Sequence, residues 1–390
     1  MTAAAVLLLA LAGVCLAIHL ASVWLCLLRS HWPCRSAGVI GLPPVSLLRP
    51  VRGCETFDAA TLASSFLQDY PDYEIVFCVE SERDPAAALV RRLIATHPGV
   101  PARLLVGAST ISGNPKLNNL WKGWRAARHD WICMADSNLM LPPEYLRQVV
   151  GAWDRGTGLV SGPPVGIWPE GLAGRLECAF LNGNQGRFQF AADSLGLGFA
   201  QGKTLFCNRL LVNAAGGFPV LGEELAEDVM ATKLVRSMGL RVRLMPQPFA
   251  QPIGRRGWRE VWARQLRWSR LRRAGFPALF LLEALNGPVV PGLALAGAAA
   301  LADLSLAEGL AGIAAFAGLW YAAEMRLLSR AGWPCGRADL LAPVLRDLLL
   351  PALWVATWLG RDIEWQGRAV AGAAEAGGKA NVDGLETLAP

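Results

Sequence analysis

The sequence predicts an α/β domain with a mainly parallel sheet, placed between membrane helices near both ends of the chain. Strand-like and helix-like segments alternate from residue 45 to residue 162, which is the pattern of a parallel sheet with helices on both faces. Charge-free segments lie near both termini, and the 390-residue chain is 53% hydrophobic but only 17% charged. Such a composition is too apolar for an ordinary soluble enzyme and indicates membrane segments.

The first segment, Thr2–Leu28, contains no Asp, Glu, Lys or Arg and is long enough to cross a bilayer as a helix. A cleaved signal peptide would have a positively charged start, a shorter apolar region and a small-residue cleavage site. Here the positive residues Arg29, Arg35 and Arg49 follow the segment instead. We therefore predict an uncleaved anchor with its N-terminus outside and the next domain in the cytoplasm.

The α/β domain follows as short apolar strands and capped helices. Two of the helices open with Asp-Pro or Asn-Pro, in which the first residue caps the helix and proline occupies its first turn. We predict strands at Val45–Val51, Tyr73–Val79, Ala102–Val106, Trp131–Ala135 and Leu159–Gly162, and helices at Asp84–Thr96, Asn114–Arg128 and Pro142–Trp153.

The pattern weakens between Glu170 and Asn208, where Gly, Asn and Gln are frequent. This stretch is either a region facing the acceptor substrate or an ordinary insertion with amphipathic helices. A helix at Val229–Met238 and a strand at Leu240–Leu244 are expected next. The basic, Trp-bearing run Arg259–Arg273 then predicts an amphipathic helix that can lie in a membrane interface.

The C-terminal part is predicted to return to the membrane. Gly287–Ala302 and Gly309–Ala323 are free of charge and the loop between them has no Lys or Arg, which predicts a hairpin out of and back to the cytoplasm. The third apolar run, Leu348–Gly360, is either part of a span that starts nearer Leu340 or an interfacial or re-entrant helix. The resulting organisation is an anchor at residues 1–30, a cytoplasmic domain at 43–275, a membrane region at 276–362 and a tail at 363–390, disordered over Ala371–Pro390.

Several function classes are not expected. The chain has no Gly-x-Gly-x-x-Gly or Gly-x-x-x-x-Gly-Lys loop, which argues against dinucleotide and P-loop chemistry. Nine cysteines without a Cys-x-x-Cys pair and four scattered histidines argue against a zinc site and a disulfide framework. The net charge of +6 is mild, and the positive residues cluster near apolar segments, which suits an anionic lipid surface better than nucleic acid.

Carboxylates stand where a parallel sheet binds ligands. Glu80, Asp84 and Asp136 fall at the carboxyl ends of predicted strands, and they fit a nucleotide held by side chains and a divalent cation. A second acidic stretch, Glu223–Asp228, lies before the basic helix. A carboxylate that can take a proton, followed by arginines that can hold an anion, indicates transfer from an activated phosphate donor. Acidic helix starts and solvated Arg-rich faces are, however, common without any catalytic role.

Taken together, these motifs resemble those of glycosyltransferase family 21, the family-2-like ceramide glucosyltransferases with the GT-A fold. That family carries three spaced aspartates and then a Gln/Arg-x-x-Arg-Trp motif. The matching residues here are Asp84, Asp136, Asp228 and the run Arg264-Gln-Leu-Arg267-Trp268, together with Asn114-Pro-Lys116-Leu-Asn118-Asn119-Leu. The resemblance covers about Val45 to Pro277. One departure is Asn138, which leaves no complete Asp-x-Asp at Asp136.

The resemblance implies an inverting transfer of glucose from UDP-glucose to the primary hydroxyl of ceramide, giving a β-glucoside, by an integral protein of the bacterial inner membrane. It implies that Asp228 is the general base and that Asp136 holds Mg²⁺ or Mn²⁺ with the diphosphate and water. Further roles are implied for five other residues: Glu80 and Asp84 at the uridine and ribose, Arg264 and Arg267 at the diphosphate, and Trp268 beside acceptor or sugar. Lys116 is a further candidate for a phosphate contact.

Other functions fit the same residues. A hopanoid or other lipid glycosyltransferase could use a different UDP-sugar, such as UDP-N-acetylglucosamine, UDP-glucuronate or UDP-galactose, because the motif residues bind the shared UDP part. A processive polysaccharide synthase shares the three aspartates, but it would need more spans and a Gln at the position of Arg264. A module that binds a nucleotide sugar without turnover would lack the base or metal carboxylate, and both are present here.

Overall fold

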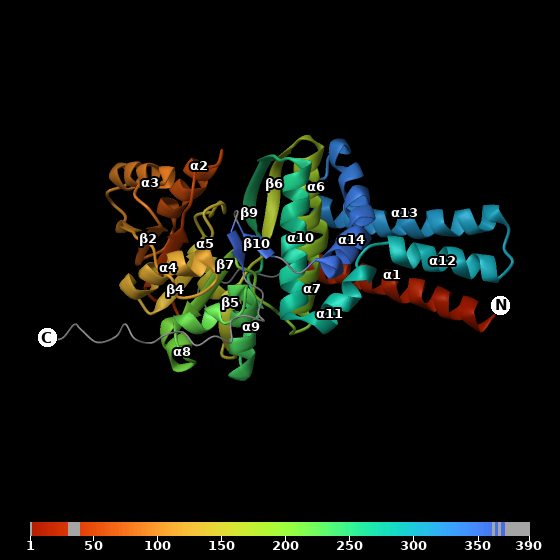
Figure 1. Cartoon of the computed structure of the whole chain (residues 1–390), viewed down its shortest axis with the longest axis horizontal. Coiled ribbons are helices and arrows are strands. Elements are labelled where there is room, and N and C mark those ends of the chain that lie inside the picture. Colours follow the sequence, from red (N-terminus) through yellow and green to blue (C-terminus); the bar gives the residue numbers. More distant parts are fainter. Residues whose placement is uncertain (1, 30–39, 361–362, 366–367, 371–390) are drawn as a thin grey trace.

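The computed structural model describes residues 2–29, 40–360, 363–365 and 368–370. It consists of an α/β domain at one end and a set of long apolar helices at the other (Figure 1). A layer of helices lies between these two parts and connects them (Figure 1).

A seven-stranded sheet forms the centre of the α/β domain, in the order β3-β2-β1-β4-β7-β5-β8. The first four strands in sequence are parallel, β5 and β8 are parallel to each other, and β7 is antiparallel to both β4 and β5. The strands are β1 (Val45–Pro50), β2 (Tyr73–Val79), β3 (Ala102–Val106), β4 (Trp131–Ala135), β5 (Thr157–Ser161), β7 (Thr204–Asn208) and β8 (Arg241–Leu244).

The predicted strands are confirmed to within two residues, and the mainly parallel character of the sheet is confirmed as well. The antiparallel strand β7 was not predicted. It lies in the stretch Glu170–Asn208, where Gly, Asn and Gln are frequent. A strand of only five residues gives no clear pattern in such a stretch.

Helices cover both faces of the sheet because successive residues of a strand point to opposite sides. Leu47 and Phe77 belong to the core on one face, and Leu48 and Val76 to the core on the other. The first core includes residues of α2 (Asp58–Ala63), α3 (Pro85–Thr96) and α5 (Tyr145–Gly151), and the second those of α4 (Pro115–Ala126), α8 (Arg209–Ala214) and α9 (Glu227–Ser237).

The cap residues explain where α3 and α4 begin. The Asp84 carboxylate accepts a hydrogen bond from the amide of Ala86, and the Asn114 side chain accepts one from Lys116, in each case over 2.9 Å. Proline follows each cap and needs no hydrogen-bond partner for its nitrogen there. Both predicted helices are confirmed, whereas α5 begins three residues later than expected, at Tyr145.

The stretch after β5 connects the sheet to the helical region. A parallel ribbon of β6 (Pro164–Glu170) and β9 (Phe249–Arg255) lies apart from the main sheet. Residues 171–194 form an unbroken helical rod made of α6 (Gly171–Ala179), the π-helical η2 (Phe180–Gly186) and α7 (Arg187–Ser194). The expected basic helix is confirmed as α10 (Trp258–Gly275).

Among the described residues, three helices are long and apolar enough to cross a membrane: α1 (Ala3–Arg29), α13 (Leu306–Arg330) and the segment Arg337–Leu359, which contains α14 (Leu341–Leu359). A fourth candidate arises if Pro277–Leu285, which holds α11 (Pro277–Leu282), and α12 (Val289–Leu301) form one broken span, bent by 57°. The predicted anchor is thus present as the helix α1, and the predicted hairpin is present as α12 and α13. All three helices pack against one another.

The direction of α14 differs from that of the other apolar helices. Figure 1 shows α1, α12 and α13 running side by side, while α14 lies steeply across them and next to α10. By length and composition α14 could span a membrane, but its packing against α10 favours the interfacial alternative for the run Leu348–Gly360.

The anchor helix α1 is fixed to the α/β domain by buried polar contacts. Arg29 forms a 2.5 Å ion pair with Asp193 of α7 and donates hydrogen bonds to the carbonyl oxygens of Leu244 and Met245. Arg187, also in the helical rod, donates a hydrogen bond to Ser22 of α1. Because both ion-pair partners are almost fully buried, α1 has a defined position relative to the sheet.

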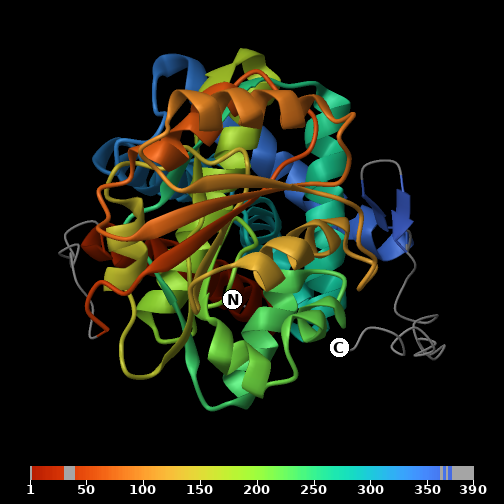
Figure 2. The same cartoon turned by 90° about the vertical axis from the view of Figure 1, so that its left-hand side faces the viewer.

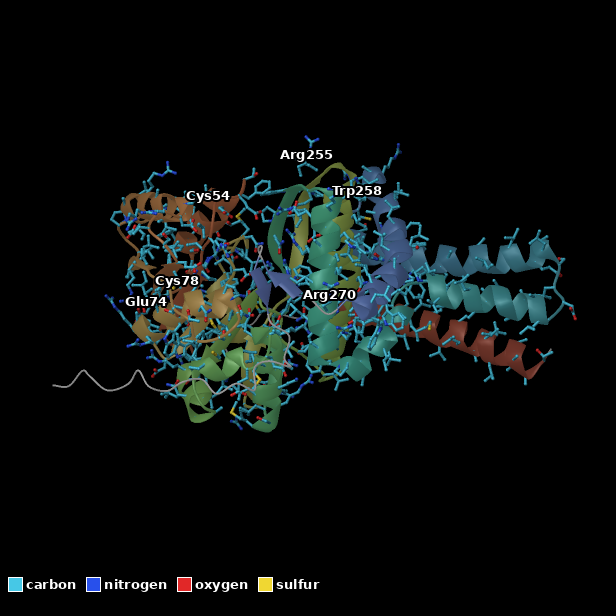
Figure 3. All side chains as sticks on the ribbon, viewed as in Figure 1. Cys54, Glu74, Cys78, Arg255, Trp258 and Arg270 are labelled. Atoms are coloured by element: carbon cyan, nitrogen blue, oxygen red, sulfur yellow. The ribbon has the colours of Figure 1, made fainter. Side chains whose placement is uncertain are left out.

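The end of the described chain is a hairpin of β10 (Ile363–Trp365) and β11 (Arg368–Val370), which lies beside α10 (Figure 2). The predicted disorder of Ala371–Pro390 falls outside the described residues. The eight cysteines in the described part of the chain are free thiols: Cys54 is exposed, Cys335 is partly exposed, and the other six, including Cys78, are buried (Figure 3).

Candidate active site

The carboxyl ends of three parallel strands bring the first site residues to one edge of the sheet. Pro50 of β1 is level with Cys78 of β2, and Leu48 of β1 is level with Met134 of β4. Glu80 and Asp136, which follow β2 and β4, therefore emerge at the same edge, as predicted. Asp84 lies nearby in the loop after β2, where its carboxylate also accepts a hydrogen bond from the amide of Gly53, over 2.9 Å.

Two lysines hold the Asp136 carboxylate. Lys116 Nζ lies 2.7 Å from Asp136 Oδ1, and Lys203 Nζ lies 3.0 Å from Asp136 Oδ2. Lys116 is in the first turn of α4, whereas Lys203 directly precedes β7. Lys203 also donates a 3.0 Å hydrogen bond to Asn138, the residue that departs from the Asp-x-Asp pattern.

Glu227, at the start of α9, extends this cluster. Its Oε1 lies 2.8 Å from Lys116 Nζ, and its Oε2 accepts a hydrogen bond from the side chain of Asn114. Lys116 is thus shared between two carboxylates, and it also donates a hydrogen bond to the carbonyl oxygen of Gly202. Asn114 therefore both caps α4 and orients Glu227.

Asp228, the predicted base, is held by the backbone. Its Oδ2 accepts a hydrogen bond from the amide of Gly202 and its Oδ1 one from its neighbour Val229, each over 2.8 Å. Both donors are neutral backbone amides. The arrangement fixes the carboxylate in one orientation.

Gly202 is the point at which these groups meet. It accepts a hydrogen bond from Lys116 and donates one to Asp228. A Cβ atom at this position would lie 2.7 Å from Glu227 Oε1 and 3.3 Å from Lys116 Nζ. Only glycine therefore leaves room for the cluster without a shift of its charged groups.

The two aspartates differ in proton affinity. Burial disfavours the charge of Asp136, but Lys116 and Lys203 outweigh that effect and lower its pKa to about 2. For Asp228, burial and the negative charge of Glu227 raise the pKa to about 6. Asp136 is thus ionised throughout the physiological range, whereas Asp228 can exchange a proton near neutral pH.

A cavity of about 240 Å³, lined mainly by polar residues, lies at the N-terminal end of α4, the helix that carries Lys116. It is lined by Glu80 from the end of β2, by the loop of residues 107–113, and by the first turns of α4, including Asn118 and Asn119. Asn119 donates a 2.8 Å hydrogen bond to the carbonyl oxygen of Cys78, which fixes α4 against the end of β2. Lys116, which pairs with Asp136, directly follows Pro115, one of the residues that line this cavity.

The two arginines predicted to bind the diphosphate, Arg264 and Arg267, lie on α10. Arg264 forms ion pairs with two glutamates. Its guanidinium is 2.9 Å from Glu177 of α6 and 3.0 Å from Glu260 of α10 itself. Glu177 is fully buried and also accepts a 3.4 Å hydrogen bond from Gln265. Burial is the main cause of the lowered pKa of Lys203, and the charges of Lys116 and then Arg264 lower it further.

Arg267 and Trp268 lie on the same helix. Burial, together with the charge of Arg264, lowers the pKa of Arg267. Trp268 packs against an apolar cluster formed by Cys178, Leu181 and Ile253. The structure therefore brings Lys116, Asp136 and Asp228 together directly, places Glu80 in the neighbouring cavity, and positions the three α10 residues mainly through contacts with α6, η2 and β9.

A second cavity, of about 320 Å³ and almost entirely apolar, lies between α6, α10 and α14. Its walls include Phe180 of η2, Trp262 of α10 and Leu353 of α14, and Gln265 contributes a polar group. Trp258, at the N-terminal end of α10, also lines it and is half exposed (Figure 3). The polar contact of Gln265 with Glu177 connects this cavity to Arg264.

Sequence reasoning missed several of these residues. Lys203, Gly202 and Glu177 lie in the stretch where the predicted pattern weakened, and they reach the site through β7 and α6. One signal was available for the first two: Gly202-Lys203-Thr204 stands directly before the apolar run Leu-Phe-Cys, as a short strand would begin. Glu177 has no comparable local signal.

Comparison with known proteins places this chain in a family. The model of glycosyl transferase family 21 matches residues 4–376. The chain belongs to this family. This membership confirms the resemblance drawn from the three aspartates and the Arg-x-x-Arg-Trp run.

The chain is 28% identical over 263 residues to ceramide glucosyltransferase 1 of Caenorhabditis elegans. It is 41% identical over 115 residues, 28% of the chain, to the ceramide glucosyltransferase of Komagataella phaffii. The first match covers 65% of this chain and 55% of the relative, and the second covers 23% of the relative, so the chain spans about half or less of the length of these relatives.

The fold is shared with a solved glycosyltransferase. The mannosyltransferase PcManGT from Pyrobaculum calidifontis, solved with GDP-Man and Mn²⁺, superposes with a TM-score of 0.51 at 18% identity, over 91% of this chain and 98% of that one. The protein therefore has the GT-A fold, with membrane-span candidates near both ends of the chain, as the family resemblance implied.

Proposed function

We propose that this family member transfers glucose from UDP-glucose to the primary hydroxyl of ceramide and forms β-glucosylceramide. One structural observation supports this most strongly. Gly202 connects Asp228, a carboxylate able to accept a proton near neutral pH, to Lys116, which belongs to a cluster able to hold a diphosphate. A single displacement at a sugar phosphate needs a base for the proton of the acceptor and a positive cluster for the leaving diphosphate. Gly202 joins two such groups.

The donor nucleoside is proposed to occupy the cavity of about 240 Å³. Glu80 at its wall can accept hydrogen bonds from a ribose or uracil, and Asp84 lies in the same loop region. Asn118 and Asn119 lie on the first turns of α4, whose N-terminal end favours negative charge. A diphosphate that continues from this cavity meets Lys116 next. The support from relatives is that the matched proteins are named as ceramide glucosyltransferases.

A divalent cation, Mg²⁺ or Mn²⁺, is part of the proposal, and Asp136 is the carboxylate that would hold it. The protein ligands at this position fit such an ion only together with the diphosphate, because each carboxylate oxygen of Asp136 forms an ion pair with a lysine. In the described part of the chain, no three His, Cys, Asp or Glu side chains gather at one metal position. When bound, the cation would neutralise charge that develops on the leaving diphosphate. That the solved mannosyltransferase holds Mn²⁺ supports this assignment.

Asp228 is proposed to act as the general base. The acceptor oxygen attacks C1 of the glucose, the bond from C1 to the phosphate oxygen breaks, and UDP leaves with the bonding electrons. The proton of the acceptor hydroxyl passes to Asp228. Because the attack comes from the face opposite the leaving group, the α-linked donor gives a β-linked product.

The residues of α10 are proposed to complete the donor site. Arg264 and Arg267 would hold the diphosphate with paired N–H donors. The charge of Arg264 also contributes to the lowered pKa of Lys203. Glu177 and Glu260 hold the Arg264 guanidinium in place. Trp268 would lie beside the sugar or the acceptor.

The acceptor is proposed to be a lipid, and the apolar cavity between α6, α10 and α14 is where its chains would lie. Half-exposed Trp258 lines this cavity, and large apolar side chains such as Leu348 and Val355 are exposed on α14. Trp and apolar side chains together are typical of a helix layer at a membrane surface. We propose that this layer lies on the cytoplasmic face of a bacterial inner membrane.

The experiment that tests this function is product analysis. The chain is expressed in a host without glycosphingolipids, ceramide is supplied, and membranes are incubated with labelled UDP-glucose, UDP-galactose, UDP-glucuronate or UDP-N-acetylglucosamine. We expect alkali-stable glucosylceramide as the new lipid. If a labelled hopanoid or diacylglycerol forms instead when those lipids are supplied, ceramide is not the acceptor. If the label enters the lipid from another UDP-sugar and not from UDP-glucose, glucose is not the transferred sugar.

A further inference from the structure

The pair of lysines on Asp136 has a consequence for the order in which ligands bind. Asp136 Oδ1 is taken by Lys116 and Oδ2 by Lys203, at 2.7 and 3.0 Å. The Asp136 side chain is 23% exposed, while the two lysines are 13% and 12% exposed. A cation that approaches Asp136 therefore meets two ammonium groups at the carboxylate oxygens it would need.

The two lysines are not equally neutralised. Lys116 lies between two carboxylates, Asp136 and Glu227, and it also donates to a backbone oxygen. Lys203 has Asp136, which it shares with Lys116, and the neutral side chain of Asn138. Lys203 thus has more to gain from an incoming anion.

The backbone around Lys203 allows its side chain to change partners. The carbonyl oxygen of Lys203 accepts a 3.0 Å hydrogen bond from the amide of Asp136, and the next residue, Thr204, begins β7 beside β4. The main chain at both residues is therefore fixed by the sheet edge. The lysine ammonium, in contrast, stands on a flexible four-carbon stem and can move without any rearrangement of the backbone.

We propose that Lys203 is a diphosphate-binding residue that closes Asp136 to divalent cations until the donor arrives. This inference rests on the proposed nucleotide-sugar function. On donor binding, the Lys203 ammonium turns from Asp136 Oδ2 to the phosphate oxygens, while Lys116 remains held by Glu227. Asp136 Oδ2 then becomes available to the cation, which consequently binds with the nucleotide and not before it.

The test is the binding of Mn²⁺ and UDP to the purified full-length protein in lipid nanodiscs. Loss of the free Mn²⁺ signal in electron paramagnetic resonance reports the bound metal, and calorimetry in EDTA reports the binding of UDP alone. We expect the wild type to take up Mn²⁺ only when UDP is present. In Lys203→Met, Mn²⁺ should bind without UDP about tenfold or more tightly than in the wild type, and UDP in EDTA should bind about tenfold or more weakly.

Two further variants separate this role from a general effect of charge or folding. Lys203→Arg keeps a cation at the position and should retain UDP binding in EDTA. Lys233→Met removes a lysine that pairs with Glu224 outside the cluster, so both affinities should match those of the wild type. If Mn²⁺ binds the wild type equally well with and without UDP, or Lys203→Met changes neither affinity, the proposal is wrong while the glycosyltransferase function stands. If UDP does not bind the wild type at all, both are wrong.

Discussion

The backbone amide of Gly202 donates a 2.8 Å hydrogen bond to Asp228 Oδ2. The same residue accepts a hydrogen bond from Lys116 through its carbonyl oxygen. One peptide segment before β7 therefore sets the position of the proposed base relative to the proposed diphosphate cluster.

Asp228→Asn should lower turnover by about 10²- to 10⁴-fold, the usual contribution of a general base, because the amide cannot take the proton of the acceptor. UDP-glucose binding should change little, since Asp228 accepts its hydrogen bonds from the backbone amides of Gly202 and Val229. Turnover by radiolabelled transfer and affinity by calorimetry measure the two effects. Wild-type-like turnover in the folded variant would remove Asp228 from the base role.

The pH dependence should report the same group. Burial and Glu227 raise the pKa of Asp228 to about 6, so its basic form is lost as the pH falls through that value. We expect kcat/KM to decrease below about pH 6 and to be nearly level above it up to neutral pH. Glu227→Gln should move the midpoint downward because it removes the negative charge that raises the pKa. A midpoint unchanged by that substitution would show that another group controls the profile.

Gly202→Ala should damage the cluster without changing any charged residue. The new methyl group would lie 2.7 Å from Glu227 and 3.3 Å from Lys116, so one of them has to move. Such overpacking costs roughly 1–3 kcal/mol. We expect a clear loss of turnover with only a modest decrease in the melting temperature. Gly99→Ala is the matched control, because a methyl group there meets nothing within 4 Å. Equal activity of the two variants would argue against the close approach at Gly202.

Arg264→Ala should destabilise the fold through Glu177. That carboxylate is fully buried, and removal of its partner leaves a buried charge, which costs about 3–5 kcal/mol. Glu260→Ala breaks the more exposed ion pairs of Glu260 with Arg264 and Arg256, and it should cost less, about 1 kcal/mol. Thermal unfolding in detergent compares the two variants. A smaller loss for Arg264→Ala than for Glu260→Ala would contradict the structural role of the Glu177 contact.

The sequence was sufficient for the residues whose position depends on local structure. Glu80 and Asp136 follow apolar strands, and the carboxyl ends of parallel strands share one edge of the sheet. Asp84 and Asn114 mark their helices because each is followed by proline. Most strands of the sheet could be predicted from their apolar runs. The order of the membrane segments could be predicted from the charge-free runs near both ends of the chain.

Contacts between distant segments could not be predicted in the same way. Lys203 reaches Asp136 only because β7 is antiparallel to β4, and a five-residue strand among small and polar residues has no strong pattern. Arg264 was expected to be available to a phosphate, but Glu177, which is 87 residues away in the sequence, pairs with it. Its role at the diphosphate stays a prediction.

The anomeric configuration of the product tests the proposed displacement most directly. Glucosylceramide made by the wild-type protein from UDP-glucose is isolated, and the coupling between its sugar H1 and H2 protons is measured by NMR. A single displacement with Asp228 as base predicts the large coupling of a β-glucoside. The small coupling of an α-glucoside would show that configuration is retained, and it would contradict this mechanism.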